Sequence, residues 1–249
     1  MRHFLSLSLF LHFSLSSSAQ QFTSPYRLSA TVDIPLSSCS ALLLLSSYGV
    51  GTTWKIPPKE TLLTLEVDNI NKFDRSAIHQ YSKTCAYISD ATVYASLLLP
   101  LIELGNRNSR NDFGKIATMS AETFVLNLAI TDMFKETIRR KRPLLYDPDI
   151  PVDKKYKKDN FKSFFSGHTS TVASMSFLFA ETFAKYNPGS KARPVVWSLC
   201  AAFPVLTGVM RYKAGKHFWT DIITGYAVGT LVGIAVPYLH KPGLVNGKQ

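Results

Sequence analysis

The sequence KETIRRKRP, residues 135–143, places several cations at one predicted helix end. Lys135 and Arg142 are seven residues apart, so on a helix of about 3.6 residues per turn they fall nearly on one line, and Arg139 shares that face. Pro143 disfavours helical geometry in the residue before it, which predicts that the helix ends near Arg142. Guanidinium groups grip a phosphate bidentately and an ammonium adds a point charge, so this helix end is predicted to bind phosphate.

The segment Ser166-Gly167-His168 stands directly before an apolar run that predicts a helix beginning at the serine. Serine is a preferred N-cap, and the glycine beside it lets an anion approach the backbone N–H groups at the positive end of the helix dipole. His168 would then lie in the first turn and face the bound anion. We therefore expect this segment to complete the phosphate site.

The run RYKAGKHFWTD, which begins at Arg211 and ends at Asp221, supplies a cation, an imidazole and a carboxylate. His217 and Asp221 are four residues apart, so the carboxylate can hold one ring nitrogen and leave the other for a substrate. The spacing predicts an oriented histidine beside the phosphate site.

Taken in this order, K-x6-R-P, S-G-H and R-x5-H-x3-D resemble the three signature motifs of the type 2 phosphatidic acid phosphatase superfamily. That superfamily also includes bacterial class A acid phosphatases and vanadium haloperoxidases. The likeness covers about residues 85–240. Each motif alone is weak because short patterns of common residues recur by chance, but three in the right order make a specific match. The chain departs at Phe165 and Met210, where many members have proline and serine, and neither change replaces a group that does chemistry.

The resemblance implies phosphoryl transfer, and the residues favour a covalent route because two histidines are present without a recognisable set of metal ligands. We expect His217 to attack phosphorus in line and form a phosphohistidine, while Asp221 holds its tautomer. By resemblance to the family, His168 protonates the leaving oxygen and then activates water. The remaining groups are predicted to bind the equatorial phosphate oxygens: Lys135, Arg142, Arg211, Ser166 and the Gly167 backbone N–H.

Other charged groups receive lesser roles. Arg139 is a candidate auxiliary cation, and Arg140 is interpreted as solvated. Asp132, three residues before Lys135, is a candidate partner of the active-site cations. A lone histidine is more often structural than catalytic, so four histidines receive no catalytic role: His3, His12, His79 and His240.

The 249-residue chain has 28 Lys and Arg residues against 17 Asp and Glu residues, a net charge of +11 that suggests an anionic partner. Nucleic acid is disfavoured as that partner because the charge is concentrated around the predicted phosphate site. Cys39, Cys85 and Cys200 do not form a disulfide framework, and no C-x-x-C motif or histidine cluster indicates zinc. We therefore expect neither a cofactor nor a metal.

Residues 1–20 have the pattern of a secretory signal peptide: a basic start, a short apolar run and small residues at the end. Residues 21–84 are predicted to form a loose lead-in and covering helices. Within them, a short helix at residues 40–54 would lie on the core or the interface, and residues 60–84 form an amphipathic stretch.

Five apolar segments of helical length follow, at residues 86–104, 116–134, 167–184, 194–210 and 219–239. None shows strand alternation, and Gly, Asn and Pro lie in their connections. The pattern predicts an all-α helical bundle of about five core helices, with a core domain at residues 85–240 and a tail at residues 241–249.

The five segments are long enough to cross a bilayer core of about 30 Å. The basic loops NRNSRNDFGK and KYNPGSKAR and the C-terminal tail would share the cytoplasmic side, provided that residues 40–54 do not cross. Carboxylates such as Asp90 and Glu122 oppose spanning, because each costs roughly 2.5–3.5 kcal/mol at mid-membrane unless it is paired. Two locations stay open: the inner membrane with the site facing the periplasm, and the soluble periplasm.

The combined prediction is a metal-independent phosphatase that hydrolyses a phosphomonoester or pyrophosphate of a membrane lipid. The alternatives are a soluble periplasmic acid phosphatase of broad specificity and a non-catalytic lipid-phosphate-binding protein, which the intact histidines oppose. A haloperoxidase is disfavoured by the chain length, but the same cations are expected to bind vanadate as an inhibitor. Phosphatidic acid, phosphatidylglycerol phosphate, undecaprenyl pyrophosphate and lipid A all fit this site.

Overall fold

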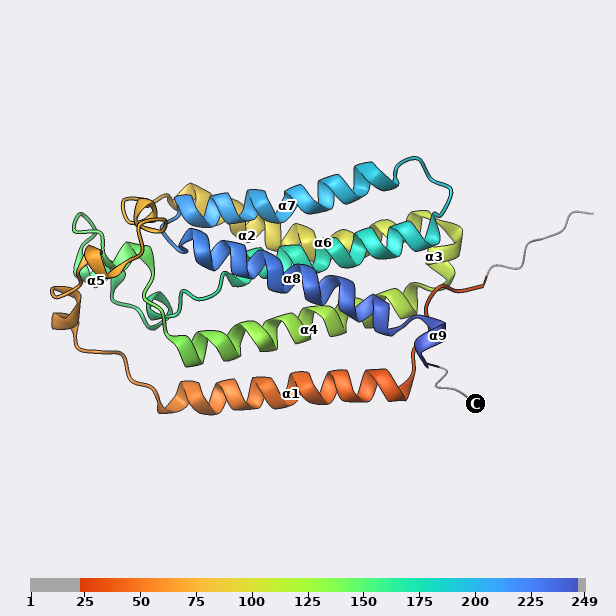
Figure 1. Ribbon diagram of the computed structural model, residues 1–249, viewed down its shortest axis with the longest axis horizontal. Coiled ribbons are helices and arrows are strands. Elements are labelled where there is room, and N and C mark those ends of the chain that lie inside the picture. Colours follow the sequence, from red (N-terminus) through yellow and green to blue (C-terminus); the bar gives the residue numbers. More distant parts are fainter. Residues whose placement is uncertain (1–22, 246–249) are drawn as a thin grey trace, which may run out of the picture.

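The computed structural model describes residues 23–245, in which six long helices run side by side (Figure 1). These are α1 (Ala30–Thr53), α2 (Lys83–Leu98, continued by the 3-10 helix η4, Leu99–Gly105), α4 (Phe113–Ile138), α6 (Gly167–Tyr186), α7 (Arg193–Lys213) and α8 (Trp219–Leu239). Three short helices lie in the connections and near the C-terminus: α3 (Arg107–Asn111), α5 (Val152–Lys155) and α9 (Pro242–Val245). No strand occurs within residues 23–245, so the all-α prediction is confirmed. The signal peptide predicted at residues 1–20 lies outside the described residues.

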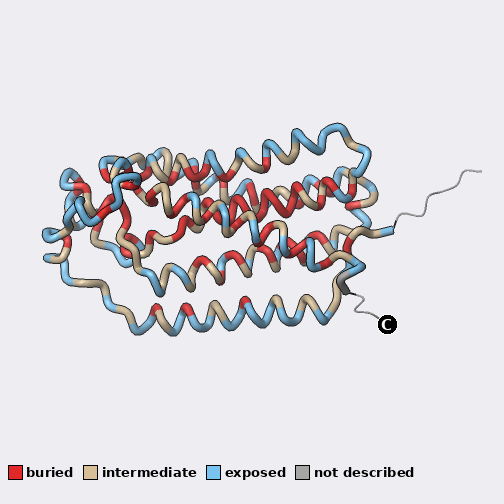
Figure 2. The backbone as a smooth tube through the Cα atoms, viewed as in Figure 1, coloured by how far each residue is buried: buried red, intermediate tan, exposed pale blue. Residues whose placement is uncertain are grey.

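Helix α6 is the inner helix of the bundle. It packs against α2, α4, α7 and α8, and most of its side chains are buried (Figure 2). Many of these buried residues are serine, threonine or alanine, small side chains that let neighbouring helices approach closely. The first residues of α6 carry one of the three motifs, so this close packing fixes where that motif lies.

Three glycines of α8 form the tightest contact with α6. Gly225, Gly229 and Gly233 recur every fourth residue and therefore share one face of the helix. A side chain at Gly225 would place its Cβ 2.5 Å from the carbonyl oxygen of Ser166, and the other two glycines lie equally close to the backbone of α6. The seam holds the beginning of α8 beside the beginning of α6, which brings two motifs together.

The helix predicted at residues 40–54, on the core or the interface, begins ten residues earlier than expected. Ser29 caps a helix that begins at Ala30, and α1 extends over 24 residues along α4. Only three of these residues are buried, while large apolar side chains such as Leu42 and Leu45 stay exposed. The serines and glycines that interrupt the apolar run do not end the helix, because Ser40, Ser47 and Gly51 form the side that is buried in the bundle.

The amphipathic stretch at residues 60–84 does not form the expected covering helix. It contains three short 3-10 turns, η1 (Lys59–Leu62), η2 (Val67–Asn69) and η3 (Arg75–Ala77). Its apolar residues still cover the bundle, since Ile70, Ala77 and Ile78 pack against Phe218. Residues 54–82 therefore form a cap over the bundle end where α8 begins.

Helix α4 ends earlier than Pro143 predicts. Its last residue is Ile138, and Arg139 adopts a left-handed conformation with φ 51° and ψ 39°. The Arg139 N–H donates to the Lys135 carbonyl at 3.3 Å, which closes the helix with a local C-cap. Arg142 consequently has an extended backbone and is not part of the helix. The prediction that Arg142 shares a helical face with Lys135 is therefore wrong.

The outer surface of the bundle is apolar. Four helices are long and apolar enough to cross a membrane: α1, α2 with η4, α7 and α8. Figure 2 shows that α1 and α7 are exposed along much of their length, and they carry exposed large residues such as Tyr48, Leu199 and Val205. Exposed apolar surface of this extent is typical of contact with lipid and indicates a membrane protein.

Candidate active site

The three motifs meet at one end of the bundle, where α4 and α7 end and α6 and α8 begin. This is the end beside α5 in Figure 1. Four segments that are separated in sequence supply the site: the end of α4 with the residues after it, the start of α6, the end of α7, and the residues before α8. Helix α2 adds groups that the sequence did not indicate.

The start of α6 lies directly against Lys135. A Cβ on Gly167 would be 3.2 Å from Lys135 Nζ and 3.0 Å from Thr131 Cγ2, so the absence of a side chain makes room for the ammonium group. Ser166 is the N-cap of α6, and its backbone N–H donates to the Asp221 carbonyl at 3.0 Å. The first and second motifs are thus in contact, and the third is bonded to the second.

Arg142 enters the site from the extended segment after α4. Its side chain is 3% exposed and forms an ion pair with Asp159 at 2.9 Å, while Nε donates to the Asp159 carbonyl at 3.0 Å. The third nitrogen, Nη1, is buried and has no hydrogen-bond partner among the described residues. Burial lowers the pKa of Arg142 below its ordinary value, although Asp159 and Asp221 act against this.

Arg211 is in the last turn of α7 and faces α2. Its Nη1 lies 3.3 Å from Ser89 Oγ and 3.7 Å from Asp90 Oδ1. Its Nε–H is buried and, within the part of the chain that the structure describes, donates to no partner. Two buried guanidinium groups thus each keep one N–H group available, and an anion would satisfy both.

His168 is held by a residue that the motifs do not contain. Its Nε2 lies 2.8 Å from Asp90 Oδ1, and Asp90 belongs to α2. Asp90, whose charge counts against placing this segment in a membrane, is therefore paired with His168 and lies beside Arg211. Asp90 is the natural candidate to orient His168.

His217 is 1% exposed, and its Nδ1 faces one carboxylate and one hydroxyl group. Asp221 Oδ2 lies 3.6 Å from Nδ1, and Ser163 Oγ lies 3.5 Å from it. Ser163 also donates to Asp221 Oδ2 at 2.5 Å, so serine and carboxylate together surround one side of the ring. Burial lowers the pKa of His217 well below its ordinary value, and the charges of Arg142, Arg211, Lys135 and His168 act in the same direction. These effects favour the neutral imidazole, in which one ring nitrogen keeps a lone pair.

Arg140, which the sequence suggested was solvated, holds the active-site carboxylate. Its guanidinium donates to Asp221 Oδ1 at 2.5 Å and to Thr220 Oγ1 at 2.7 Å, and it forms an ion pair with Asp74 at 2.8 Å. It also lies over the Phe218 ring, 4.2 Å from the ring centroid. Although burial raises the pKa of Asp74, hydrogen bonds from Thr220, Arg140 and Asn71 leave it below its ordinary value.

Arg139 and Asp132, the two candidate auxiliary residues, do not join this network. Arg139 lies over the Trp54 ring at 5.3 Å and bonds to the carbonyl oxygens of Glu136 and Val50. Asp132 is half-buried one turn before Lys135 and interacts with it electrostatically, but its side chain has no hydrogen bond to another described residue. The left-handed backbone at Arg139 directs its side chain toward α1, and this explains why Arg139 lies away from the site.

Lys216 is a further cation that sequence reasoning missed. It precedes His217, and its carbonyl oxygen accepts a bond from Ser163 at 3.4 Å. Burial, together with the neighbouring charges of Arg142 and Arg211, lowers its pKa to about 8. Its spacing within RYKAGKH gave no signal, because a lysine in a basic run is usually solvated.

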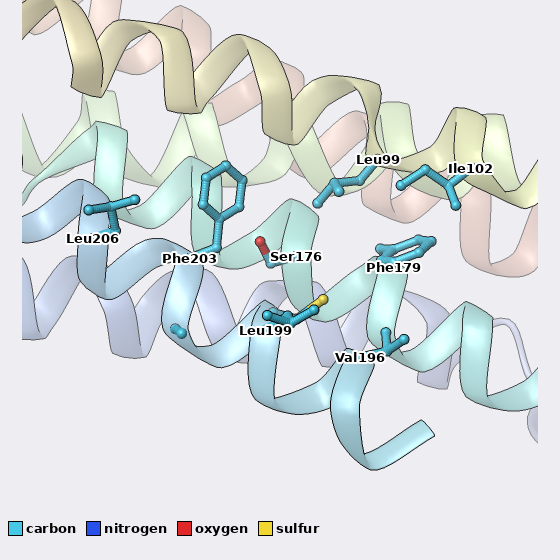
Figure 3. A pocket seen from close by; sticks show the side chains of 10 residues that line it. Leu99, Ile102, Ser176, Phe179, Val196, Leu199, Phe203 and Leu206 are labelled. Atoms are coloured by element: carbon cyan, nitrogen blue, oxygen red, sulfur yellow. The ribbon is translucent and has the colours of Figure 1, made fainter. Parts of the chain in front are cut away.

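An apolar cavity of about 460 Å³ lies apart from these charges, between η4, α6 and α7 (Figure 3). Its lining includes Leu99, Phe179, Leu199 and Phe203, and no charged side chain borders it. The contact between α2 and α7 extends from the site toward this cavity. Arg211 lies beside Ser89 next to the site, and one turn farther along a hydrogen bond of 2.9 Å joins Thr92 and Thr207.

Fold and site together define a helical membrane protein that places two histidines among buried cations suited to a phosphoryl group. The model of the PAP2 superfamily matches residues 117–243, just over half of the 249-residue chain. The chain therefore belongs to the PAP2 superfamily, which confirms the family that the three motifs predicted.

Two curated relatives are similar over part of their length. The "Probable lipid phosphate phosphatase 4" of Arabidopsis thaliana is 31% identical over 132 residues, which cover 44% of this chain and 42% of the relative. Phosphatidylglycerophosphatase B of Bacillus subtilis strain 168 is 34% identical over 71 residues, 28% of this chain and 35% of the relative. The match thus spans less than half of the length of either relative.

Among solved structures, a transmembrane PAP2 type phosphatidylglycerolphosphate phosphatase from Bacillus subtilis aligns with a TM-score of 0.49 and 18% sequence identity. The alignment covers 82% of this chain and 94% of that chain.

Proposed function

We propose that the protein is a metal-independent phosphatase that hydrolyses a phosphomonoester or pyrophosphate of a membrane lipid through a phosphohistidine. The observation that carries the proposal is the pair of buried guanidinium groups, Arg142 and Arg211, whose unpartnered N–H groups lie among the cations that surround the neutral His217. Such an arrangement destabilises the folded protein, because a buried donor without a partner costs about 1–3 kcal/mol. It is suited to an anion that arrives as substrate.

In the proposed first step, the free ring nitrogen of His217 attacks phosphorus and the bond from phosphorus to the leaving oxygen breaks. His168 gives that oxygen a proton, using the nitrogen that Asp90 does not hold. Asp221, fixed by Arg140 and Ser163, stabilises the positive charge that the His217 ring acquires. In the second step His168 takes a proton from water, hydroxide attacks phosphorus, and the bond to His217 breaks to release phosphate.

The remaining phosphate-binding groups act on the oxygens that do not leave. We assign this role to Lys135, Arg142, Arg211, Ser166 and the Gly167 backbone N–H. Charge on these oxygens is stabilised most effectively by fixed donors in a site of low dielectric constant, and the burial of both arginines provides this. The same cations should hold vanadate, which we propose as an inhibitor.

A lipid substrate is supported by three observations. The exterior of the bundle is apolar, both curated relatives carry names of lipid phosphatases, and an apolar cavity lies farther along α7 from the site. Cys200 in that cavity is eleven residues before Arg211, which is about 16 Å along a helix and close to half of a bilayer core. The distance suits a lipid whose hydrocarbon part reaches the cavity while its phosphate lies among the cations. A soluble periplasmic acid phosphatase fits the apolar exterior poorly.

We further propose that the site end of the bundle faces the periplasm from the inner membrane. The support is the basic character of the opposite end, where the loops after η4 and α6 carry Arg107, Arg110, Lys191 and Arg193. The site end is basic as well, but the cations around the phosphate site are accounted for by substrate binding.

The proposal is tested by phosphate release in detergent micelles from a panel of lipid phosphates, lipid pyrophosphates and water-soluble phosphate esters, with EDTA present. Wild type, His217→Ala and the exposed-histidine control His79→Ala are compared. We expect release from lipids by wild type and by the control, none by His217→Ala, and inhibition by vanadate. Chemical quench with labelled substrate should trap protein-bound phosphate that is stable in base and labile in acid, as phosphohistidine is.

Equal release by His217→Ala would exclude the phosphohistidine. Binding of lipid phosphate without any turnover would favour the non-catalytic binding protein instead, and a preference for water-soluble esters would favour the acid phosphatase.

A further inference from the structure

Three ionisable side chains from distant parts of the chain meet at the bundle end opposite the candidate active site. Asp33 comes from the start of α1, Glu122 from the first half of α4, and His240 from the residue that caps α8. His240 is completely buried, and its Nε2 lies 2.9 Å from Asp33 Oδ1 and 3.2 Å from Glu122 Oε2. The proposed phosphatase mechanism uses none of these groups.

The imidazole of His240 is oriented by the backbone. Its Nδ1 lies 2.8 Å from the Val236 carbonyl oxygen, which accepts only if Nδ1 carries a proton. In the neutral ring Nε2 then has a lone pair, and this lone pair points at both carboxylates. A histidine whose Nδ1–H is held by a carbonyl while Nε2 faces outward is in the orientation that metal-bound histidines usually have.

Glu122 supplies a second, independent observation. Its side chain is 8% exposed, and its Oε2 is buried without a hydrogen-bond partner among the described residues. Even a protonated Nε2 carries a single hydrogen, and Asp33 Oδ1 accepts it at the shorter distance. The Glu122 oxygen is therefore left with only the longer, 3.2 Å contact to His240 Nε2, which is costly for a carboxylate in the interior unless a further cation pairs with it.

The separations between the ligand atoms suit a shared metal ion. Zinc binds histidine nitrogen and carboxylate oxygen at about 2.0–2.2 Å, which places neighbouring ligand atoms about 2.9–3.5 Å apart in octahedral or tetrahedral geometry. The two observed separations from Nε2 are 2.9 and 3.2 Å, and all three ligand atoms lie within 4.8 Å of one another. No large rearrangement is needed to place an ion between them.

The surroundings leave room for the remaining ligands. A cavity of about 230 Å³ lies between α1 and α4, and Glu122 lines it together with Ser37 and Ser40. Asp33 is 27% exposed, so an ion can reach the cluster from solvent. Water molecules in this space could complete the coordination.

We propose that Asp33, Glu122 and His240 bind one divalent transition-metal ion of the zinc class, which fastens α1 to α4 and α8. One imidazole nitrogen and two carboxylate oxygens form a ligand set that such ions accept, and the ion's charge balances both carboxylates. The sequence gave no sign of this site, because its ligands are at positions 33, 122 and 240 and form no motif.

The test is metal binding by the purified full-length protein in detergent after EDTA treatment and removal of the chelator. Co²⁺ is titrated as a spectroscopic substitute for Zn²⁺, and the melting temperature is recorded with and without Zn²⁺. Wild type is compared with Glu122→Gln and His240→Gln, and with the exposed-residue controls Glu66→Gln and His79→Gln.

We expect wild type and both controls to bind one Co²⁺ per chain with visible d–d absorption, and Zn²⁺ to raise their melting temperature. Affinity should fall at least about ten-fold in Glu122→Gln and His240→Gln, and the Zn²⁺-dependent increase in melting temperature should disappear. Absence of stoichiometric binding by wild type would overturn the proposal and leave the cluster as a protonated histidine between two carboxylates. A cobalt–thiolate band, or binding that both substitutions leave unchanged, would overturn it as well.

Discussion

Arg139 and Arg140 are neighbours in sequence, but their side chains serve opposite sides of the structure. Arg140 links Asp221 and Asp74, whereas Arg139 lies over Trp54 beside α1. The link matters for chemistry because the Asp221 carboxylate is the group that stabilises a charged His217 in the proposed mechanism. A carboxylate that is free to rotate would lose this alignment with the ring.

Arg140→Ala is therefore expected to lower kcat/KM for phosphate release by about 10²-fold, since small misplacements of catalytic groups have effects of this size. Arg139→Ala is the matched control, and we expect it to keep near-wild-type turnover while losing about 1 kcal/mol of stability from its cation–π contact. Steady-state kinetics and thermal unfolding of both variants are the measurement. Equal loss of turnover in the two variants would contradict the division of roles.

The neutral state of His217 predicts a pH dependence. Its ordinary pKa is 6.5, and burial together with the charges of Arg142 and Arg211 holds the folded-state pKa well below this. Because the proton binds only below the lowered pKa, the nucleophile should stay neutral as the pH falls through 6.5. The same shift means that the unfolded chain binds this proton more readily, so His217 favours unfolding below pH 6.5.

Titration of ¹⁵N-histidine-labelled protein by NMR measures this directly, with His217→Asn to assign the signal. We expect the His217 ring to remain neutral at pH 6.5. A midpoint at or above 6.5 would show that the ring is accessible to water and that the buried arginines do not act on it.

At the residue scale, the sequence could identify the groups that carry chemistry but not those that hold them. His217 and Asp221 share a helical spacing, so their proximity is local and visible. Arg140 reaches Asp221 across 81 positions, and Asp90 reaches His168 across 78, so no periodicity reveals either contact. Such partners are set by the packing of the bundle, which a single sequence does not specify.

At the scale of the elements, the contact between α6 and α8 determines the site geometry. Gly229 lies against the Ser170 carbonyl, and a Cβ there would also be 2.8 Å from Ala173 Cβ. Backbone atoms on the inner helix cannot move aside as a flexible side chain would. Any increase in size must therefore separate the two helices and, with them, the Ser166 and Asp221 ends.

Gly229→Ala is expected to destabilise the protein by at least about 1–3 kcal/mol, as overpacking does, and to lower turnover at the site. Gly114→Ala, in α4 with open space around the glycine, is the helical control and should be neutral or stabilising by up to about 1 kcal/mol. Thermal unfolding in detergent measures the stability of both variants. A stable and active Gly229→Ala would show that the seam is looser than the structure indicates.

The five apolar segments predicted the five long helices from residue 83 onward, α2, α4, α6, α7 and α8, because their length and composition leave few alternatives. Helix ends were less predictable. Pro143 indicated an end at Arg142, whereas a local cap at Arg139 ended α4 first. The sequence at residues 60–84 has the apolar spacing of a helix, but the structure forms short 3-10 turns there. Its apolar residues pack one by one on the bundle end and not along one helical face.

At the scale of the whole molecule, α1 changes the topology that the sequence suggested. Six long helices that alternate in direction along the chain place residues 23–29 at the same end as the loop after α6, and the cap at residues 54–82 at the other end, with the site. An interfacial helix would instead leave residue 23 on the side of the cap. The two arrangements differ in a measurable way.

Single cysteines at Thr23, Lys72 and Ser190, in a background with Cys39, Cys85 and Cys200 replaced by serine, distinguish them by labelling with a membrane-impermeant maleimide. Thr23 and Lys72 are exposed, and Ser190 lies in the turn between α6 and α7. If α1 spans the membrane, Thr23→Cys and Ser190→Cys should react from one side and Lys72→Cys from the other, because an apolar helix of 24 residues is about 36 Å long and exceeds the bilayer core of about 30 Å. Reaction of Lys72→Cys from outside intact cells would also support a site that faces the periplasm. Labelling of Thr23→Cys and Lys72→Cys from the same side would restore the interfacial helix and reduce the bundle to five crossings.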